Sequence, residues 1–201
     1  MKKLTKVIAA AGIAVATLFT TNAVKAQSTT PPNAWRFGIG VEGGVPTGAA
    51  RNYSRAMLGG TARLQYGVAQ NVALTLTSGY YNMFGRDAVK LPGNNNDIRY
   101  KAMGLVPLKA GVKAYIGSGF YVAGEVGAGF ETSVFGLVKG QSDDNFKKNT
   151  KFIVAPGIGY SWSNVDFGVR YEHFSGGQAN YVGQNNNYGM VAARLAYGFK
   201  L

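Results

Sequence analysis

Lys151–Trp162, with the sequence KFIVAPGIGYSW, alternates between large apolar residues and small ones. Successive side chains of a β-strand point to opposite faces, so a period of two places all the large residues on one face. The other face carries small or polar groups. The segment therefore predicts a strand with one apolar face, formed by Phe152, Val154, Pro156, Ile158, Tyr160 and Trp162.

The same alternation recurs in seven other segments of the chain. Strict alternation over such lengths is typical of half-buried strands, and eight of them favour a sandwich or a barrel. Pro107 and Pro156 fall inside predicted strands. Because proline has no N–H to give to the ladder, we expect a bulge or a local break at each. The seven segments span about residues 35–45, 57–66, 72–84, 102–115, 120–131, 165–174 and 188–200.

The lengths of the connections indicate how these strands are arranged. Long and short connections alternate from the first to the last, which is the arrangement of outer-membrane barrels with short periplasmic turns. The predicted fold is therefore all-β, an eight-stranded antiparallel up-and-down transmembrane β-barrel with both termini at the short-turn end. The short connections lie near residues 67–71, 117–119 and 163–164, and the long ones at about 46–56, 85–101, 132–150 and 175–187.

The start of the chain predicts a signal peptide. A basic stretch, MKKLTK, precedes an apolar run that ends near Phe19, and Val24-Lys25-Ala26 supplies the small residues of a cleavage site. The run is shorter than the ~20 residues of a membrane-spanning helix. We divide the chain into a signal peptide (1–26), a periplasmic leader (27–34) and the barrel (35–201), and expect the exported protein in the outer membrane of a Gram-negative bacterium.

Composition excludes several kinds of site. The chain has no cysteine and one histidine, His173, so disulfides, a lipid-bearing cysteine and a multi-histidine zinc site are excluded, and we expect no metal or cofactor. The net charge of +12 falls to +8 when the four lysines of the signal peptide are removed. Charged residues make up 15% of the chain, against about 25% in soluble domains.

The polar faces of the strands are too thinly charged for a solvated exterior, which disfavours a soluble lipocalin-like barrel. We therefore expect apolar faces toward lipid and the nearly balanced charges inside, where they can pair. An eight-stranded barrel is just wide enough for its side chains to fill it, so a plugged lumen is expected. The predicted lumen ion pairs involve Arg36, Glu42, Arg63, Lys109, Lys113, Glu125, Glu131, Asp166, Arg170, Glu172 and Arg194. Interfacial aromatic girdles are predicted at Trp35, Phe120, Phe130, Trp162, Tyr171, Tyr197 and Phe199.

The signal peptide, the eight alternating strands and the ending NYGMVAARLAYGFKL resemble the bacterial outer-membrane β-barrel domain family of small OmpA/OmpX-like or porin-like barrels. The resemblance covers essentially the whole mature chain. It implies recognition of the last strand by the barrel-assembly machinery. Tyr197 and Phe199 match that signal in phase, whereas the final residue is Leu201 rather than phenylalanine.

Two motifs suggest chemistry. Gly38, Gly40 and Gly43 match the dinucleotide fingerprint, but Pro46 and a loop follow where the motif needs a helix. His173 and Ser175, at the loop end of a strand, resemble the pair used by PagL-type lipid A deacylases, in which histidine activates serine to attack an ester. That family uses a glutamate about a dozen residues beyond the serine, and this stretch contains no carboxylate. The enzyme is an alternative to a non-enzymatic barrel.

The long connections are basic, and two interpretations remain open. The charges are either ordinary solvated loop charges or a cationic rim that meets the phosphates and sugars of lipopolysaccharide. Nucleic acid is disfavoured because the charges are divided among separate loops. We expect a monomeric barrel that contacts outer-membrane lipids and has a structural or surface-interaction role, with a narrow passive pore as a further alternative. The rim bases are Arg51, Arg55, Arg86, Lys90, Arg99, Lys101, Lys147 and Lys148.

Overall fold

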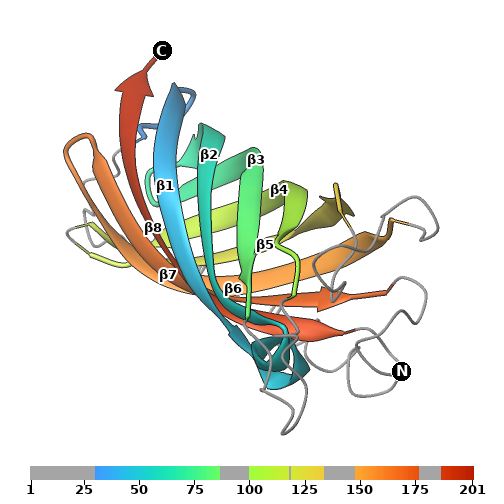
Figure 1. Ribbon diagram of the computed structural model, residues 1–201. Coiled ribbons are helices and arrows are strands. Elements are labelled where there is room, and N and C mark those ends of the chain that lie inside the picture. The colour runs from blue at the N-terminus through green and yellow to red at the C-terminus, as the bar shows by residue number, and fades with distance from the viewer. Residues whose placement is uncertain (1–29, 87–99, 118, 134–147, 177–186) are drawn as a thin grey trace, which may run out of the picture.

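The computed structural model describes residues 30–86, 100–117, 119–133, 148–176 and 187–201 (Figure 1). Eight antiparallel strands form one closed barrel in which each strand pairs with its neighbours in sequence, and β1 pairs with β8. This confirms the predicted fold class. The elements are β1 (Trp35–Thr47), the short 3₁₀ helix η1 (Gly48–Asn52), β2 (Ser54–Ala69), β3 (Val72–Gly85), β4 (Met103–Tyr115), β5 (Phe120–Glu131), β6 (Thr150–Trp162), β7 (Val165–Ser175) and β8 (Tyr188–Lys200).

Strand β2 differs most from its predicted extent, because it continues for three residues beyond each predicted end. The β2–β3 ladder shifts register between Ser54 and Ala56 and again between Gly67 and Ala69. A bulge inserts a residue and interrupts the period of two. Because of the two irregularities, the alternation of apolar and polar residues does not extend to the ends of β2, and a prediction from alternation makes the strand too short.

The short connections lie at the end of the barrel where β1 begins and β8 ends, as the pairing of Arg36 with Lys200 demonstrates. The β6–β7 turn consists of two residues, and Ser163 adopts a φ of 50°. Two-residue hairpins need a positive φ at their first central position to match the twist of the strands. This end is the periplasmic end of the barrel by the rule of short turns, and the opposite end is called the loop end below.

Both predicted ladder breaks are present. The β3–β4 pairing stops at Ser78↔Leu108 and resumes in the same register at Tyr81↔Leu105, which leaves a gap beside Pro107. The β6–β7 pairing has a similar gap between Val154↔His173 and Gly157↔Arg170, beside Pro156. On the other side each proline is paired with β5, opposite Gly129 and Gly124 respectively. The missing N–H thus opens one ladder at each proline without a shift in register.

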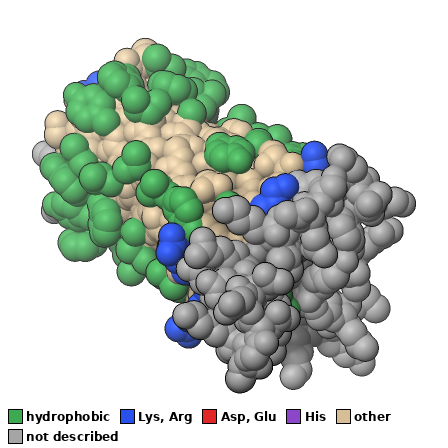
Figure 2. Space-filling view, viewed as in Figure 1, with side chains coloured by type: hydrophobic (Ala, Val, Ile, Leu, Met, Phe, Trp, Pro, Cys, Tyr) green, Lys and Arg blue, Asp and Glu red, His purple; other side chains and the backbone are tan. Residues whose placement is uncertain are grey.

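The outer surface of the barrel is apolar. Figure 2 shows many hydrophobic side chains on the visible wall, with backbone and other side chains between them, and most of the visible Lys and Arg side chains lie near the residues that are not described. All eight strands contribute exposed apolar side chains, including Ile39, Leu58, Leu76, Leu108, Val126, Ile158, Val169 and Leu195. A continuous apolar exterior of this size fits lipid rather than water. The predicted girdle residues are also exposed: Trp35, Phe120, Phe130, Trp162, Tyr171, Tyr197 and Phe199.

The described part of the leader docks onto the periplasmic end of β2. The backbone N–H of Asn33 donates to the carbonyl of Gly67 at 2.8 Å, and the N–H of Gly67 donates to the carbonyl of Ala34 at 3.0 Å. Thr30 is buried, and its hydroxyl accepts a hydrogen bond of 2.8 Å from the amide of Gln65. Residues 30–34 are therefore part of the folded unit. The predicted signal peptide (1–26) lies outside the described residues.

Candidate functional site in the lumen and at the loop end

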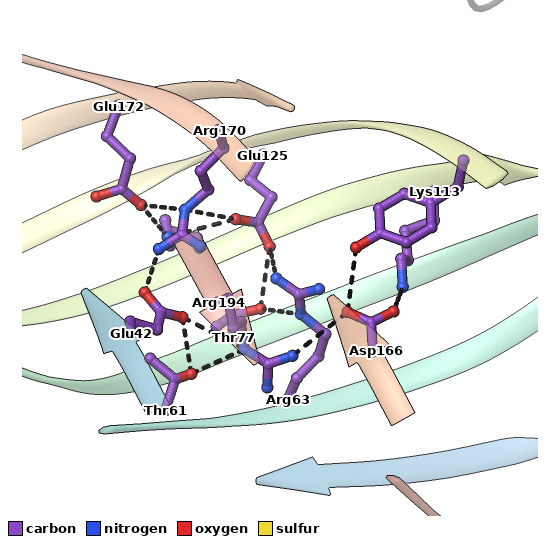
Figure 3. A network of polar contacts seen from close by, with 12 residues as sticks. Glu42, Thr61, Arg63, Thr77, Lys113, Glu125, Asp166, Arg170, Glu172 and Arg194 are labelled. Carbon is purple, nitrogen blue, oxygen red and sulfur yellow. Dashed lines mark hydrogen bonds and ion pairs between the residues drawn. The ribbon is translucent and has the colours of Figure 1, made fainter. Parts of the chain in front are cut away.

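A network of charged and hydroxyl side chains occupies the middle and the periplasmic part of the lumen, and we call it the polar tier (Figure 3). Its members alternate with the outward apolar residues of their strands, so the period of two that creates the lipid-facing surface also collects these groups inside. They come from all eight strands, and the acids and bases face one another across the lumen. The polar tier comprises Arg36, Glu42, Thr61, Arg63, Gln65, Thr77, Tyr81, Lys109, Lys113, Tyr121, Glu125, Ser161, Asp166, Arg170, Glu172 and Arg194.

Lys109 lies in the polar tier with a side chain that is 0% exposed. Its ammonium forms an ion pair with Glu172 and lies 3.3 Å from Glu125 Oε2. It also donates a hydrogen bond of 3.1 Å to the hydroxyl of Tyr81. Arg170 approaches the same carboxylate, with Nε 2.7 Å from Glu172 Oε1. A buried charge is costly unless it is paired and hydrogen-bonded, and here each charge has at least one opposite partner.

Two further clusters complete the middle of the polar tier. Arg63 Nη2 lies 2.7 Å from Glu125 Oε1, and Arg63 Nε donates to the hydroxyl of Thr77 at 2.9 Å. Glu42 forms an ion pair with Arg170 and lies 3.3 Å from Arg194 Nε. Both clusters share Arg170 with the Glu172 cluster, since Arg170 Nε also lies 4.0 Å from Glu125 Oε2. The middle of the lumen is thus one connected network.

In the periplasmic part of the polar tier, Asp166 interacts with four other side chains. Its carboxylate pairs with Lys113, accepts hydrogen bonds from the hydroxyls of Ser161 and Tyr121, and lies 3.7 Å from Arg194 Nη1. Arg36 donates hydrogen bonds to backbone carbonyl oxygens, those of Ser163 at 2.9 Å and Gly198 at 3.4 Å. Several cations therefore converge on a region with a single carboxylate.

The loop-side part of the lumen is apolar, which sequence reasoning missed. We call this cluster the apolar tier. Met57 pairs directly with Met83, and Met83 with Met103, across β2, β3 and β4. Met190 of β8 lies close to Met57, since a Cβ placed at Gly44 would lie 2.9 Å from Met190 Sδ and 3.1 Å from Met57 Cε. The apolar tier comprises Met57, Met83, Met103, Leu105, Ile153, Ala155, Phe174, Tyr188, Met190 and Ala192, with Tyr81 shared between the tiers.

One enclosed ion pair lies on the loop side of the apolar tier. Lys151 Nζ is 3.9 Å from Glu131 Oε1 and donates a hydrogen bond of 2.8 Å to the carbonyl of Gly176. Glu131 was expected among the lumen ion pairs, whereas Lys151 was not. The inward position of Lys151 follows from the alternation of β6, in which it precedes Phe152. Sequence parity could therefore have identified it.

Three of the predicted rim bases line one cavity at the loop end. Arg51 of η1, Arg55 of β2 and Arg86, which follows β3, surround about 130 Å³ together with Val45, Pro46 and Ser54. Arg86 is held by its backbone N–H, which donates to the carbonyl of Tyr53 at 2.8 Å, and by its guanidinium, which donates to the carbonyl of Arg51 at 2.7 Å. No acidic side chain lines the cavity among the described residues. We call it the arginine cavity.

The structure describes two of the other five rim bases. Lys101 and Lys148 are described and lie outside the arginine cavity. Lys90, Arg99 and Lys147 lie outside the described residues.

His173 and Ser175 both lie on the outward face of β7, opposite Val154 and Phe152 of β6. In the described part of the chain neither side chain makes a hydrogen bond or an ion pair. Glu172 points to the other face and is engaged with Lys109 and Arg170. A nucleophile needs a base within hydrogen-bond reach and a third group that orients the base. The geometry of such a triad is not present among these residues.

Closure into eight strands, an apolar exterior and an enclosed polar network together define an integral outer-membrane β-barrel protein. In the described residues no helix is long and apolar enough to cross a membrane. The same residues contain no group of three or more His, Cys, Asp or Glu side chains that could hold a metal ion.

Comparison with solved structures agrees with the barrel fold. The chain is similar to Ail, the attachment invasion locus protein of Yersinia pestis, with 14% identity, a TM-score of 0.52, and coverage of 85% of this chain and 99% of Ail. OprG from Pseudomonas aeruginosa gives 12% identity, a TM-score of 0.49, and coverage of 85% and 97%. The N-terminal barrel domain of OprF, also from Pseudomonas aeruginosa, gives 16%, 0.46, and coverage of 84% and 98%. No protein family and no curated protein matches the sequence. The similarity to Ail concerns the fold.

Proposed function

We propose that this protein is a non-enzymatic, monomeric outer-membrane barrel of a Gram-negative bacterium that binds the phosphate groups of lipopolysaccharide at its loop end. The observation that carries the proposal is the arginine cavity. Three guanidinium groups line about 130 Å³ without an acidic side chain among the described residues. Arginine is suited to phosphate because its planar fork of N–H donors matches the oxygens of the anion.

The position of the arginine cavity favours a lipid-bound phosphate over a free one. Val45, which lines the cavity, also belongs to the lipid-facing surface and is 56% exposed. The loop end of a barrel lies at the outer leaflet, where lipopolysaccharide phosphates reside at the level of the interface. A phosphate attached to lipid A can therefore reach the three arginines without leaving the membrane.

The alternatives have less support. A deacylase needs a hydrogen bond between His173 and Ser175, and the described residues show none between these two side chains. A pore needs a continuous aqueous path. Among the described residues, two cavities that adjoin the polar tier have volumes of about 30 and 20 Å³, which is enough for single water molecules. On the loop side of these two cavities, the lumen contains the buried side chains of the apolar tier.

Binding of lipid A to the purified protein in detergent tests the proposal. We expect bisphosphorylated lipid A to bind more tightly than dephosphorylated lipid A, and the triple variant Arg51→Gln/Arg55→Gln/Arg86→Gln to lose about 100-fold in affinity, because each cation near the surface contributes about 1 kcal/mol. Lys148→Gln is the matched control, since it removes an exposed loop-end charge outside the cavity. Equal affinity of the triple variant and the wild type contradicts the proposal. Loss of an acyl chain from the recovered lipid A contradicts its non-enzymatic part.

A further inference from the structure

The periplasmic part of the lumen contains a small, partly open cavity that is lined by more cations than carboxylates. It has a volume of about 30 Å³ and is lined by Arg36, Arg63, Lys113 and Arg194, with Asp166 as its only carboxylate among the described residues. Gln65 and Ser161 complete the polar part of its wall. A space of this size holds one water molecule or one small ion.

The carboxylate in this wall is already engaged. Asp166 pairs with Lys113, accepts hydrogen bonds from Ser161 and Tyr121, and is shared with Arg194 at 3.7 Å. Arg63, which also lines the cavity, lies 2.7 Å from Glu125, and Arg194 Nε lies 3.3 Å from Glu42. Among the described residues that line the cavity, Asp166 is therefore the single carboxylate beside four cations.

Arg194 provides a second, independent observation. Its side chain is 3% exposed. Nε donates to the hydroxyl of Thr61 at 3.0 Å, and Nη1 lies near Asp166, but Nη2 has no hydrogen-bond partner among the described residues. A buried guanidinium N–H without an acceptor is costly, so an acceptor in the cavity would stabilise the folded barrel.

The enclosed charged side chains of the whole barrel, like those around the cavity, include more bases than acids. In the described residues seven Lys and Arg side chains are enclosed with five carboxylates, so the enclosed bases outnumber the enclosed acids by two. The bases are Arg36, Arg63, Lys109, Lys113, Lys151, Arg170 and Arg194, and the acids are Glu42, Glu125, Glu131, Asp166 and Glu172. Because the Glu131–Lys151 pair is balanced, the excess belongs to the polar tier, where the cavity lies.

We infer that this cavity is a binding site for one small inorganic anion, a halide such as chloride, held by Arg194 Nη2 and the cations around it. A halide has the charge that the site lacks, accepts hydrogen bonds from several directions and fits a space of water size. Sulfate and phosphate are too large for this space. The anion would accept the hydrogen bond of Arg194 Nη2 and add a negative charge to the polar tier. This inference is independent of lipopolysaccharide binding at the loop end.

Bromide, which replaces chloride and scatters anomalously, tests the inference on the unmodified protein. Crystals grown in sodium bromide are expected to contain an anomalous peak within hydrogen-bond distance of Arg194 Nη2. The absence of a peak there, with density for water only, overturns the inference.

Unfolding in urea gives a second, solution measurement. The midpoint is expected to rise and saturate with sodium chloride relative to sodium gluconate at equal ionic strength, because a ligand that binds only the folded state stabilises it. Arg194→Gln is expected to lose the difference between the two salts, whereas Lys200→Gln, which removes an exposed cation at the same end of the barrel, retains it. A wild-type midpoint that is the same in both salts also overturns the inference.

Discussion

The polar tier and the apolar tier occupy the same lumen and are both largely buried, yet they are stabilised in different ways. In the polar tier, Lys109, Glu172 and Arg170 depend on one another, because each is a buried charge. In the apolar tier, side chains such as Met103 and Phe174 depend on packing alone. Charge pairing requires particular chemical groups, whereas apolar packing requires mainly volume and shape. The two tiers should therefore respond differently to substitutions that preserve shape.

The largest effect is expected for Glu172→Gln, which preserves shape and removes the charge. The change leaves Lys109 and Arg170 buried without their shared carboxylate, and removal of one partner from a buried pair costs about 3–5 kcal/mol. Urea-induced unfolding of the protein from lipid vesicles measures the loss as a lower midpoint at unchanged slope. The double variant Lys109→Met/Glu172→Leu is the control and is expected to recover part of the stability. A Glu172→Gln protein as stable as the wild type would show that the polar tier does not depend on this carboxylate.

An intermediate effect is expected in the apolar tier. Met103→Ala leaves a cavity beside Met83 and is expected to cost about 2–5 kcal/mol, whereas Met103→Leu preserves volume and is expected to cost less than about 1.5 kcal/mol. The same unfolding measurement compares them. A greater cost for Met103→Leu than for Glu172→Gln would reverse the contrast between the tiers.

The smallest effect is expected where the tiers meet. Pro107 lies between Leu105 of the apolar tier and Lys109 of the polar tier, and the gap beside Pro156 faces Glu172. Pro156→Ala restores a backbone N–H and is expected to stabilise the barrel by about 1 kcal/mol through one added ladder hydrogen bond. Slow hydrogen exchange at the new amide checks the bond directly. Fast exchange there would indicate that the ladder remains open for a reason other than the missing N–H.

The sequence predicted the barrel well because its information lies in alternation, which is local. The predicted bounds of β5 and β8 agree with the observed ones to the residue. Alternation along the strand also placed Arg63 of β2 and Glu125 of β5 on the correct, inward face. The position of a residue along the barrel axis, in contrast, is not determined by local alternation. It depends on the register between strands, which places Met57, Met83 and Met103 side by side although they are far apart in the chain. The division of the lumen into two tiers was therefore not predictable from alternation alone.

The arginine cavity was predictable only in part. Arg51, Arg55 and Arg86 were identified as rim bases because they lie in the long connections between predicted strands. Their convergence depends on the pairing of β2 with β3 and on η1, whose short helical turn brings Arg51 beside the strand ends. Lys148 has the same charge and also belongs to a long connection, yet it lies outside the cavity. Composition could not distinguish the two cases.

The apolar tier also makes the protein a convenient subject for spectroscopy. The chain has five methionines, and all except Met1 belong to this tier. Isotope labelling of methionine methyl groups would therefore produce four resonances from the described residues, all of them from the apolar tier. Their chemical shifts would report on the loop-side interior alone, without signals from the lipid-facing wall. Occupancy of the arginine cavity, whose lining residue Pro46 is paired with Met190, could be followed through the resonance of that one methyl group.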